Sequence, residues 1–483
     1  MRTLILSDIH MGPDGDFDIF AGAKELPAYL ERFVSPPTRV IINGDGVDFL
    51  MNMDPLTLDP ARAVEQAQAI ANAPSTAPVF EVLGRILAAG GEVEVLIGNH
   101  DIELALSEVQ EVFRGALKQS AKTASRMVFI RCDKPYLLDQ DGARILITHG
   151  QHSDEWNRIP WEKLPGAEQP DAAPEGFQYP PGSMLVKTLL NPAKKYFRMR
   201  VADLLKPDFR GAVLTAMAVD PSAIGVVWKK STIELITLLA SAKASPNTFA
   251  DGEEAIPMED LPELGLGELL AEAGLTPAEK EALQAQLSGL DEGPEFFADD
   301  SFFDRIKAKL ADAGLRRYAA VHRRVAGNSG ESYFSLEPTK DEWTEAQRLA
   351  RDWNAGAVII GHTHSARWRT ASVGAGSETD AKKRPLTFLN TGTWIWMMRL
   401  PTAAPPDADP PTQAKADKDW QDYLQELREN PSLEPEHQKL VRLEKRFTAA
   451  LVDSAPNGAR LSLVEWKDGQ EIVLGSDIIP PSM

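Results

Sequence analysis

The chain has 483 residues, of which 43% are hydrophobic and 25% charged, and these proportions exclude a largely disordered chain or a collagen-like repeat. With 51 Lys and Arg against 71 Asp and Glu, its formal net charge of −20 disfavours sequence-independent binding along a nucleic-acid backbone, which needs a basic surface. Its single cysteine, Cys132, excludes an intramolecular disulfide. No targeting segment and no run of about 20 apolar residues is visible, so we expect a cytoplasmic protein without a transmembrane segment.

Short apolar runs alternate with helical stretches over the first 150 residues, which predicts an α/β core. Each run is β-branched and bounded by glycine or polar residues, as a buried strand should be. Helices are expected at 61–73 and 79–89. The predicted strands are Thr3–Ser7, Arg39–Asn43, Glu92–Ile97, Ala143–Thr148 and, far downstream, Gly356–Ile360.

Each of these predicted strands is followed at once by Asp, Asn or His side chains. The motifs at the strand ends read DIH, GDGVD, GNHD, THG and GHTH, in chain order. In an open α/β sheet, ligands bind outside the carboxyl ends of the strands, where the loops converge. We therefore expect one site built from Asp8, His10, Asp45, Asn99, His100, Asp101, His149, His362 and His364.

Most of these side chains are candidate metal ligands, because histidine and carboxylate together suit Zn, Mn, Fe or Co. Their number exceeds what one four- to six-coordinate ion needs, whereas two ions sharing a bridging carboxylate fit it. Two ions about 3.5–4 Å apart form a clamp for phosphoryl chemistry, with a metal-bridging hydroxide as the expected nucleophile. The candidate ligands are Asp8, His10, Asp45, Asn99, His149, His362 and His364.

The five motifs, in this order and each after a strand, are similar to the signature blocks of the calcineurin-like metallophosphoesterase superfamily. The similarity covers roughly residues 1–150 and 355–400. It implies an α/β fold, a four-layer αββα sandwich, with two divalent transition-metal ions at one edge; manganese is favoured, with iron or zinc as alternatives. By this resemblance, Asp8, His10, Asp45 and His364 would hold one ion, and Asp45, Asn99, His149 and His362 the other.

The resemblance also implies roles for residues beside the ligands. His100 would stabilise or protonate the leaving oxygen of the substrate, and Asp101 would orient and polarise His100. Asp48, the second acid of GDGVD, is expected to hydrogen-bond to a metal ligand. His152 and Asp154 either contact the substrate or continue a polar loop.

The expected function is metal-dependent hydrolysis of a phosphate ester, assisted by His100. The GDGVD block and an insertion before GHTH are also distantly similar to the UDP-2,3-diacylglucosamine pyrophosphohydrolases, which carry Arg where this chain has His100. Three alternatives therefore stay open: a nuclease acting on DNA or RNA, a pyrophosphohydrolase of a nucleotide diphosphate-linked substrate, and a non-catalytic binding module on the same fold.

The middle of the chain differs from the parts that carry the motifs in its predicted secondary structure and in its charge. We expect the core to comprise residues 1–152 and 354–400, and residues 153–353 to form a mostly helical insertion. Within it, residues 251–300 carry many Asp and Glu but only one basic residue, Lys280. This acidic stretch is most often a solvated surface, and it is the candidate surface for a protein partner.

The sequence after residue 400 predicts a linker, short helices and the closing strands of the core. Residues 401–445 begin with a Pro-rich segment, read as a linker, and continue with short helices at 417–428 and 435–445. Residues 446–483 predict the closing strands of the core and a C-terminal tail. The dipeptide Asp468-Gly469 is typical of the tight turn of a β-hairpin.

Overall fold

The structure, a computed structural model, describes residues 1–164, 176–197, 274–288, 309, 334–374, 383–398, 401, 404, 408–429 and 443–482. They fall into two units, which are described separately. The first unit comprises Met1–Met184, Phe334–Trp396 and Lys445–Met483, and the second comprises Leu185–Tyr333 and Met397–Glu444. All candidate site residues lie in the first unit.

A seven-stranded sheet holds the first three predicted strands at its centre. The strands β1 (Arg2–Leu6), β2 (Thr38–Asn43), β3 (Glu92–Leu96) and β4 (Met127–Ile130) pair in parallel in that order. The apolar residues of β1, β2 and β3 are buried on both faces, as in other parallel sheets, whereas Val128 of the edge strand β4 is exposed.

Three antiparallel strands near the C-terminus complete this sheet. They are β12 (Phe447–Ala455), which pairs with β1, then β13 (Gly458–Lys467) and β14 (Gln470–Ile479). Asp468 and Gly469, between β13 and β14, have φ angles of 51° and 78°, as a two-residue type I′ hairpin turn requires. Residues 446–483, expected to close the core, thus contain three strands and a tight hairpin turn.

A five-stranded sheet brings together segments that are far apart in the sequence. Its order is β5 (Tyr136–Gln140), β6 (Ala143–Ile147), β7 (Ala357–Ile360), β9 (Lys383–Thr391) and β8 (Ala366–Gly374). The three inner strands are parallel, and the two edge strands pair antiparallel. A separate two-stranded sheet comprises β10 (Trp396–Met398) and β11 (Leu443–Lys445).

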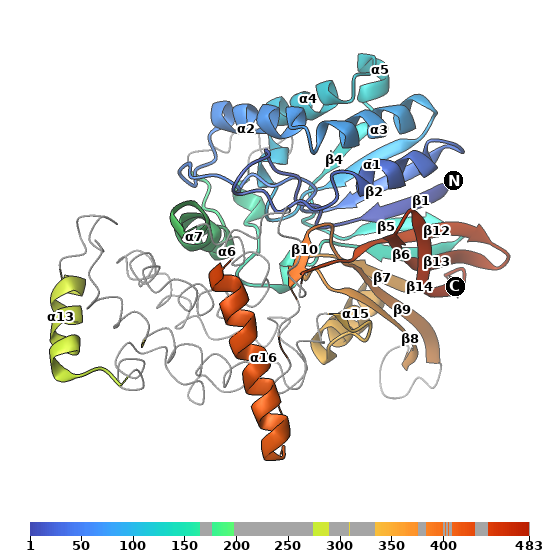
Figure 1. The fold of residues 1–483 in the computed structure, drawn as a ribbon. Coiled ribbons are helices and arrows are strands. Elements are labelled where there is room, and N and C mark those ends of the chain that lie inside the picture. Colours follow the sequence, from blue (N-terminus) through green and yellow to red (C-terminus); the bar gives the residue numbers. More distant parts are fainter. Residues whose placement is uncertain are drawn as a thin grey trace. The chain divides into compact units, whose positions relative to one another are not determined.

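Helices cover the outer faces of the two larger sheets (Figure 1). Residues on β1 alternate between two cores, because successive side chains of a strand point to opposite faces: Leu4 and Leu6 pack with the helices over the seven-stranded sheet, whereas Ile5 packs between the sheets. A third core, which includes Leu349 and Phe388, lies between the five-stranded sheet and α15 (Lys340–Asp352). The order is therefore helix, sheet, sheet, helix, as the resemblance implied. The covering helices of the seven-stranded sheet are α1 (Glu25–Leu30), α2 (Pro60–Asn72), α3 (Ala77–Ala88), α4 (Ser107–Ala116) and α5 (Ala121–Ala124).

Several helices of the predicted insertion and linker are described. Thr276 and Glu279 exchange bonds at the start of α13 (Pro277–Ser288), so this helix begins with a capping box. The helix α16 (Pro410–Glu429) starts inside the segment predicted as a linker, because the Asp409 carboxylate accepts a bond from the Thr412 N–H and caps the helix. The other helices described here are α6 (Pro181–Leu185), the π-helix Val186–Leu190 and α7 (Asn191–Phe197).

Other predictions for this part of the chain fall on residues outside the described ranges. Of the acidic stretch 251–300, the structure describes only residues 274–288. Of the helix predicted at 435–445, it describes only Leu443–Lys445, which is strand β11. In the described part of the chain, none of the helices has the length and apolar character to cross a bilayer.

Candidate metal centre

The predicted site residues follow the carboxyl ends of five parallel strands. Asp8 and His10 come after β1, Asp45 after β2, Asn99 after β3, His149 after β6, and the two histidines of GHTH after β7. All seven candidate ligands are buried or nearly so, with His362 the most exposed, at 9% of its side chain. The two sheets meet at this edge, which is why residues so distant in sequence share one site.

Left-handed backbone conformations recur among these residues. The φ angle is 50° at Asp8, 52° at His10, 51° at Asp45, 69° at His362 and 60° at His364. Left-handed conformations cost L-residues roughly 1–2 kcal/mol each, although Asp, Asn and His adopt them more readily than most. Such strain persists only where the surrounding structure imposes it, and it clusters at functional sites. The sharp turns direct successive side chains from each strand end toward the same centre.

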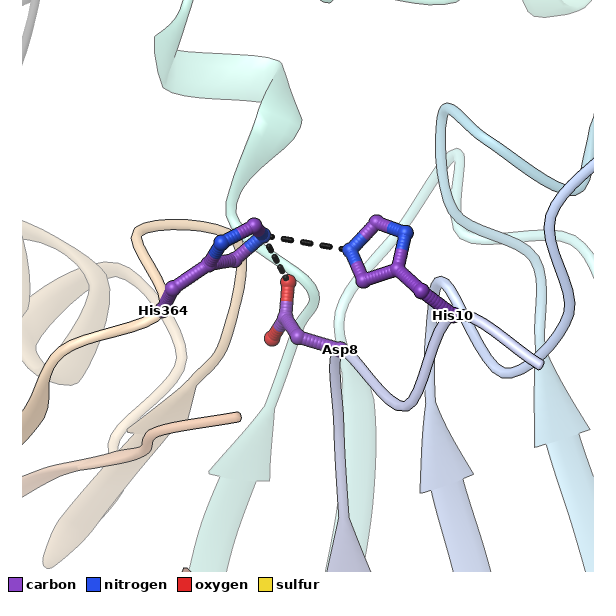
Figure 2. Close-up of side chains that lie close together, drawn as sticks. All are labelled: Asp8, His10 and His364. Atoms are coloured by element: carbon purple, nitrogen blue, oxygen red, sulfur yellow. Dashed lines mark hydrogen bonds and ion pairs between the residues drawn. The ribbon is translucent and has the colours of Figure 1, made fainter. Parts of the chain in front are cut away.

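The first cluster of donors comprises Asp8, His10 and His364 (Figure 2). His364 Nε2 lies 3.4 Å from Asp8 Oδ1 and 3.1 Å from His10 Nε2. Backbone bonds hold the carboxylate, because the His362 N–H donates to Asp8 Oδ2 over 2.9 Å. Two imidazole nitrogens and a carboxylate thus face one point.

The second cluster comprises Asp45, His149 and His362, with Asn99 beside them. His149 Nε2 lies 3.2 Å from Asp45 Oδ2 and 3.3 Å from Asn99 Oδ1. Asp45 Oδ2 is also 4.0 Å from His10 Nε2 of the first cluster. One carboxylate oxygen therefore stands between the two clusters.

The spacing of these donors fits divalent metal ions. With metal–ligand bonds of about 2.1 Å, neighbouring ligand atoms of one ion stand about 3.0–3.5 Å apart. The four donor pairs within the two clusters lie between 3.1 and 3.4 Å apart. Each cluster mixes imidazole nitrogen with carboxylate or amide oxygen, the set that suits Mn, Fe and Zn.

Hydrogen bonds fix which nitrogen two of the histidines present. His10 Nδ1 lies 2.9 Å from Asp48 Oδ2, and His149 Nδ1 donates to the Asn43 carbonyl over 2.8 Å. In both rings the Nε2 atom is left facing the cluster. A ring nitrogen held by a carboxylate or carbonyl is the usual arrangement behind a metal-binding histidine, because it sets the tautomer and the ring orientation.

Glycines let the carboxylates approach the neighbouring backbone. A Cβ atom at Gly98 would lie 2.2 Å from Asp45 Oδ1, and one at Gly361 would lie 2.6 Å from Asp8 Oδ2. Both glycines belong to the predicted motifs, GNHD and GHTH. The arrangement of the donors therefore requires a residue without a side chain at both positions.

The charges of the site favour cation binding. Burial opposes ionisation of Asp45, but His149, His100 and His10 outweigh it and hold the pKa of Asp45 well below its usual range. Burial would lower the pKa of His149, yet Asp45 and Asp8 raise it to about 9. Burial, together with the charge of Asp45, raises the pKa of Asp8. Without metal, a proton on His149 therefore balances part of the carboxylate charge that a metal ion would balance instead.

Comparison with known families agrees with this geometry. Residues 1–191 match the family model of the calcineurin-like phosphoesterases. This part of the chain is therefore similar to a calcineurin-like phosphoesterase domain. None of the curated proteins compared with the chain matches it. The family implies hydrolysis of phosphate esters with divalent metal ions, and the two histidines of GHTH, beyond the matched range, join the site through β7.

His100 lies beside the candidate metal ligands and contacts an acid that the sequence did not assign to it. His100 Nδ1 lies 2.9 Å from Asp48 Oδ2, the same oxygen that contacts His10. Burial of Asp48 would raise its pKa, but the neighbouring His100 and His10 outweigh this effect. They hold the pKa of Asp48 well below its usual range. The Asp48 carboxylate therefore stays ionised beside two histidines.

Asp101 has other partners than the sequence suggested. Its two carboxylate oxygens accept the Gly46 N–H at 2.8 Å and the Gly98 N–H at 2.6 Å. It thus joins the GDGVD loop to the GNHD loop, while Asp48 takes the position beside His100. Burial and the nearby Asp45 charge raise the pKa of Asp101 well above its usual value.

The polar loop after His149 also reaches the site. Asp154 Oδ2 lies 3.1 Å from His362 Nε2, and Asn157 Oδ1 accepts a bond from Asn99 Nδ2 over 3.3 Å. Sequence reasoning left Asp154 undecided and missed Asn157. Neither residue belongs to a motif, and the only indication in the sequence is that both lie shortly after THG. His152 points elsewhere: its Nε2 lies 3.3 Å from Glu345 Oε1 on α15.

Proposed function

We propose that the protein is a dinuclear metal-dependent phosphoesterase. Asp8, His10, Asp45 and His364 would hold one ion, and Asp45, Asn99, His149 and His362 the other, with manganese favoured. The observation that carries this proposal is the position of Asp45 Oδ2, which is 3.2 Å from His149 Nε2 and 4.0 Å from His10 Nε2. A carboxylate between two groups of donors is suited to bridge two ions.

The metal ions, when bound, would polarise the phosphate and acidify the water that attacks phosphorus. The chain's own residues supply the rest of the chemistry. His100 would protonate the leaving oxygen through Nε2, since its Nδ1 faces Asp48. The ionised Asp48 carboxylate would hold the ring in this orientation and stabilise its protonated form, as a buried acid does behind a catalytic histidine.

Asp45 would also position His100 for this step. The Asp45 Oδ1 atom accepts the backbone N–H of His100 at 2.8 Å, which ties the proposed acid to the bridging carboxylate. A shift of either residue would therefore move the other. The leaving oxygen must lie within hydrogen-bond reach of His100, whose ring is partly accessible at 10% of its side chain.

The test is Mn²⁺-dependent hydrolysis of a bis-aryl phosphate diester beside the matching aryl monoester. Turnover of either substrate that requires the metal supports the proposal. Faster diester turnover would point to diester substrates such as nucleic acids or phospholipids, and faster monoester turnover to small phosphorylated metabolites or phosphoproteins. A protein that binds no divalent metal and turns over neither substrate would overturn it.

A further inference from the structure

The loop that follows His149 contacts two proposed ligands of the second cluster, His362 and Asn99. The carboxylate of Asp154 and the amide of Asn157 are joined by a bond of 2.7 Å from Asn157 Nδ2 to Asp154 Oδ2. We call this pair the Asp154–Asn157 brace. Its residues belong to none of the five motifs, and the side chain of Asp154 is 13% exposed.

One end of the brace meets His362. Asp154 Oδ2 lies 3.1 Å from His362 Nε2, a hydrogen-bond distance. In His10 and His149, the nitrogen that contacts an oxygen outside the two clusters of proposed ligands is Nδ1, whereas Nε2 faces those ligands. In His362 the nitrogen that contacts an oxygen outside the ligand set is instead Nε2.

The other end of the brace meets Asn99. The Asn99 amide nitrogen donates to Asn157 Oδ1, which turns the Asn99 carbonyl oxygen toward His149 Nε2. The brace packs tightly, since a Cβ atom at Gly182 would lie 2.2 Å from Asn157 Oδ1. Two proposed ligands of the same ion are thus held by one pair of side chains.

We propose that Asp154 is a positioning residue of the second ion: its carboxylate accepts the Nε2–H of His362, so that His362 presents Nδ1 to the metal. His10 and His149 present Nε2 instead. This inference rests on the proposed function, because it assigns the coordinating atom of one of its ligands. Asn157 completes the brace by fixing the Asp154 carboxylate and the Asn99 amide together.

The coordinating nitrogen can be observed directly. Metal-free protein labelled with ¹⁵N-histidine would be titrated with ZnCl₂, and long-range ¹H–¹⁵N spectra would report the state of each ring nitrogen. Signals of His362 would be assigned by their loss in the His362→Gln variant. We expect zinc on Nδ1 and a proton on Nε2 for His362, and the reverse for His149. Zinc on Nε2 of His362 would mean that this nitrogen is a ligand itself, and would overturn the proposal.

Variants of the brace supply a second measurement. In Asp154→Ala, we expect the affinity of the second zinc equivalent to fall by about 10- to 100-fold while the first is retained. Asp154→Asn keeps an oxygen acceptor and should restore both the affinity and the Nδ1 coordination. Two zinc equivalents bound to Asp154→Ala with unchanged affinity would overturn the inference.

Glu345→Gln is the matched control. The Glu345 carboxylate anchors the same loop by accepting a bond from Ser153 Oγ over 2.9 Å, but it makes no described contact with a proposed ligand. Zinc binding of this variant should equal that of the wild type. An equal loss of zinc in Glu345→Gln would assign the effect to the loop's position and overturn the specific role of Asp154. Wild-type protein that binds neither zinc nor manganese, and turns over neither aryl substrate, would overturn the proposed function itself, whereas the other failures leave that function standing.

Discussion

Asp48 Oδ2 lies 2.9 Å from Nδ1 of His100, and both side chains are buried. This contact determines how the proposed acid can work. A histidine whose Nδ1 faces an ionised carboxylate presents Nε2 to the substrate and is stabilised in its protonated form. Since the same oxygen contacts His10, the proposed proton donor and a proposed metal ligand share one acceptor.

Replacement of His100 tests its role as the acid. In His100→Ala, we expect kcat to fall by roughly 10²–10⁴-fold on substrates with poor leaving groups, because general acid catalysis contributes about that much. The loss should be small on substrates whose leaving group needs no proton. Metal content, measured by elemental analysis, should be unchanged. Loss of metal from this variant would make His100 a ligand and contradict its assignment. His152→Ala is the control, because His152 contacts Thr148 and Glu345 and no proposed ligand.

Replacement of Asp48 tests the shared acceptor. In Asp48→Asn, a neutral amide replaces the charged carboxylate that contacts both histidines. The variant therefore loses the negative charge that stabilises the positive charge of His100 as the proposed acid. We expect kcat to fall by about 10- to 100-fold, more on poor leaving groups than on good ones. Steady-state kinetics with an aryl series of different leaving-group acidity would measure this difference. An equal loss across the whole series would instead point to a defect in metal binding through His10.

The pH dependence of metal binding follows from His149. Its pKa is about 9 in the folded, metal-free protein, above the ordinary value of 6.5. A raised pKa contributes stability that is fully present below pH 6.5 and lost as pH rises through 9. The metal must displace this proton. Apparent affinity for Zn²⁺ or Mn²⁺ should therefore increase from pH 7 to pH 9.

Calorimetry of metal-free protein in two buffers with different ionisation enthalpies would count the protons released. We expect proton release at pH 7 and much less near pH 9.5. His149→Gln cannot carry this proton, and its remaining metal affinity should depend less on pH over this range. A binding isotherm that is independent of pH between 7 and 9 in the wild type would show that His149 is neutral before the metal arrives.

The strands and the donors could be predicted because their signals are local in the sequence. A buried strand such as β1 is an unbroken apolar run, and Asp8 and His10 follow it directly, so topology alone brings them to the sheet edge. Predicted strand ends differ from the structure by about one residue. The start of α16 was missed because the cap at Asp409 outweighs the Pro-rich composition that suggested a linker.

Contacts between loops could not be predicted from local signals in the sequence. Asp48 and Asp101 are both acids next to motif residues, and only the folded loops decide that Asp48 meets His100 while Asp101 joins Gly46 to Gly98. The same holds for Asp154 and His362, which lie on different loops more than two hundred residues apart. Neither pairing has a spacing or a periodicity that a sequence could display.

Gly98 offers a test of how closely the donors are packed. A Cβ atom there would lie 2.2 Å from Asp45 Oδ1 and 2.5 Å from the Asp45 backbone nitrogen, so Gly98→Ala must displace the proposed bridging carboxylate. We expect loss of most bound metal, as in Asp45→Ala, and destabilisation by about 1–3 kcal/mol from overpacking. Metal analysis and denaturant unfolding would measure the two effects.

Gly115→Ala is the matched control for this substitution. Gly115 lies in α4, and a Cβ atom there meets nothing within 4 Å. Since alanine restricts the unfolded chain more than glycine does, this variant should be as stable as the wild type or more stable by about 0.4–1 kcal/mol. Its metal content should be unchanged. Full metal occupancy in Gly98→Ala would mean that Asp45 tolerates a shift, and would contradict its proposed role as the bridging ligand.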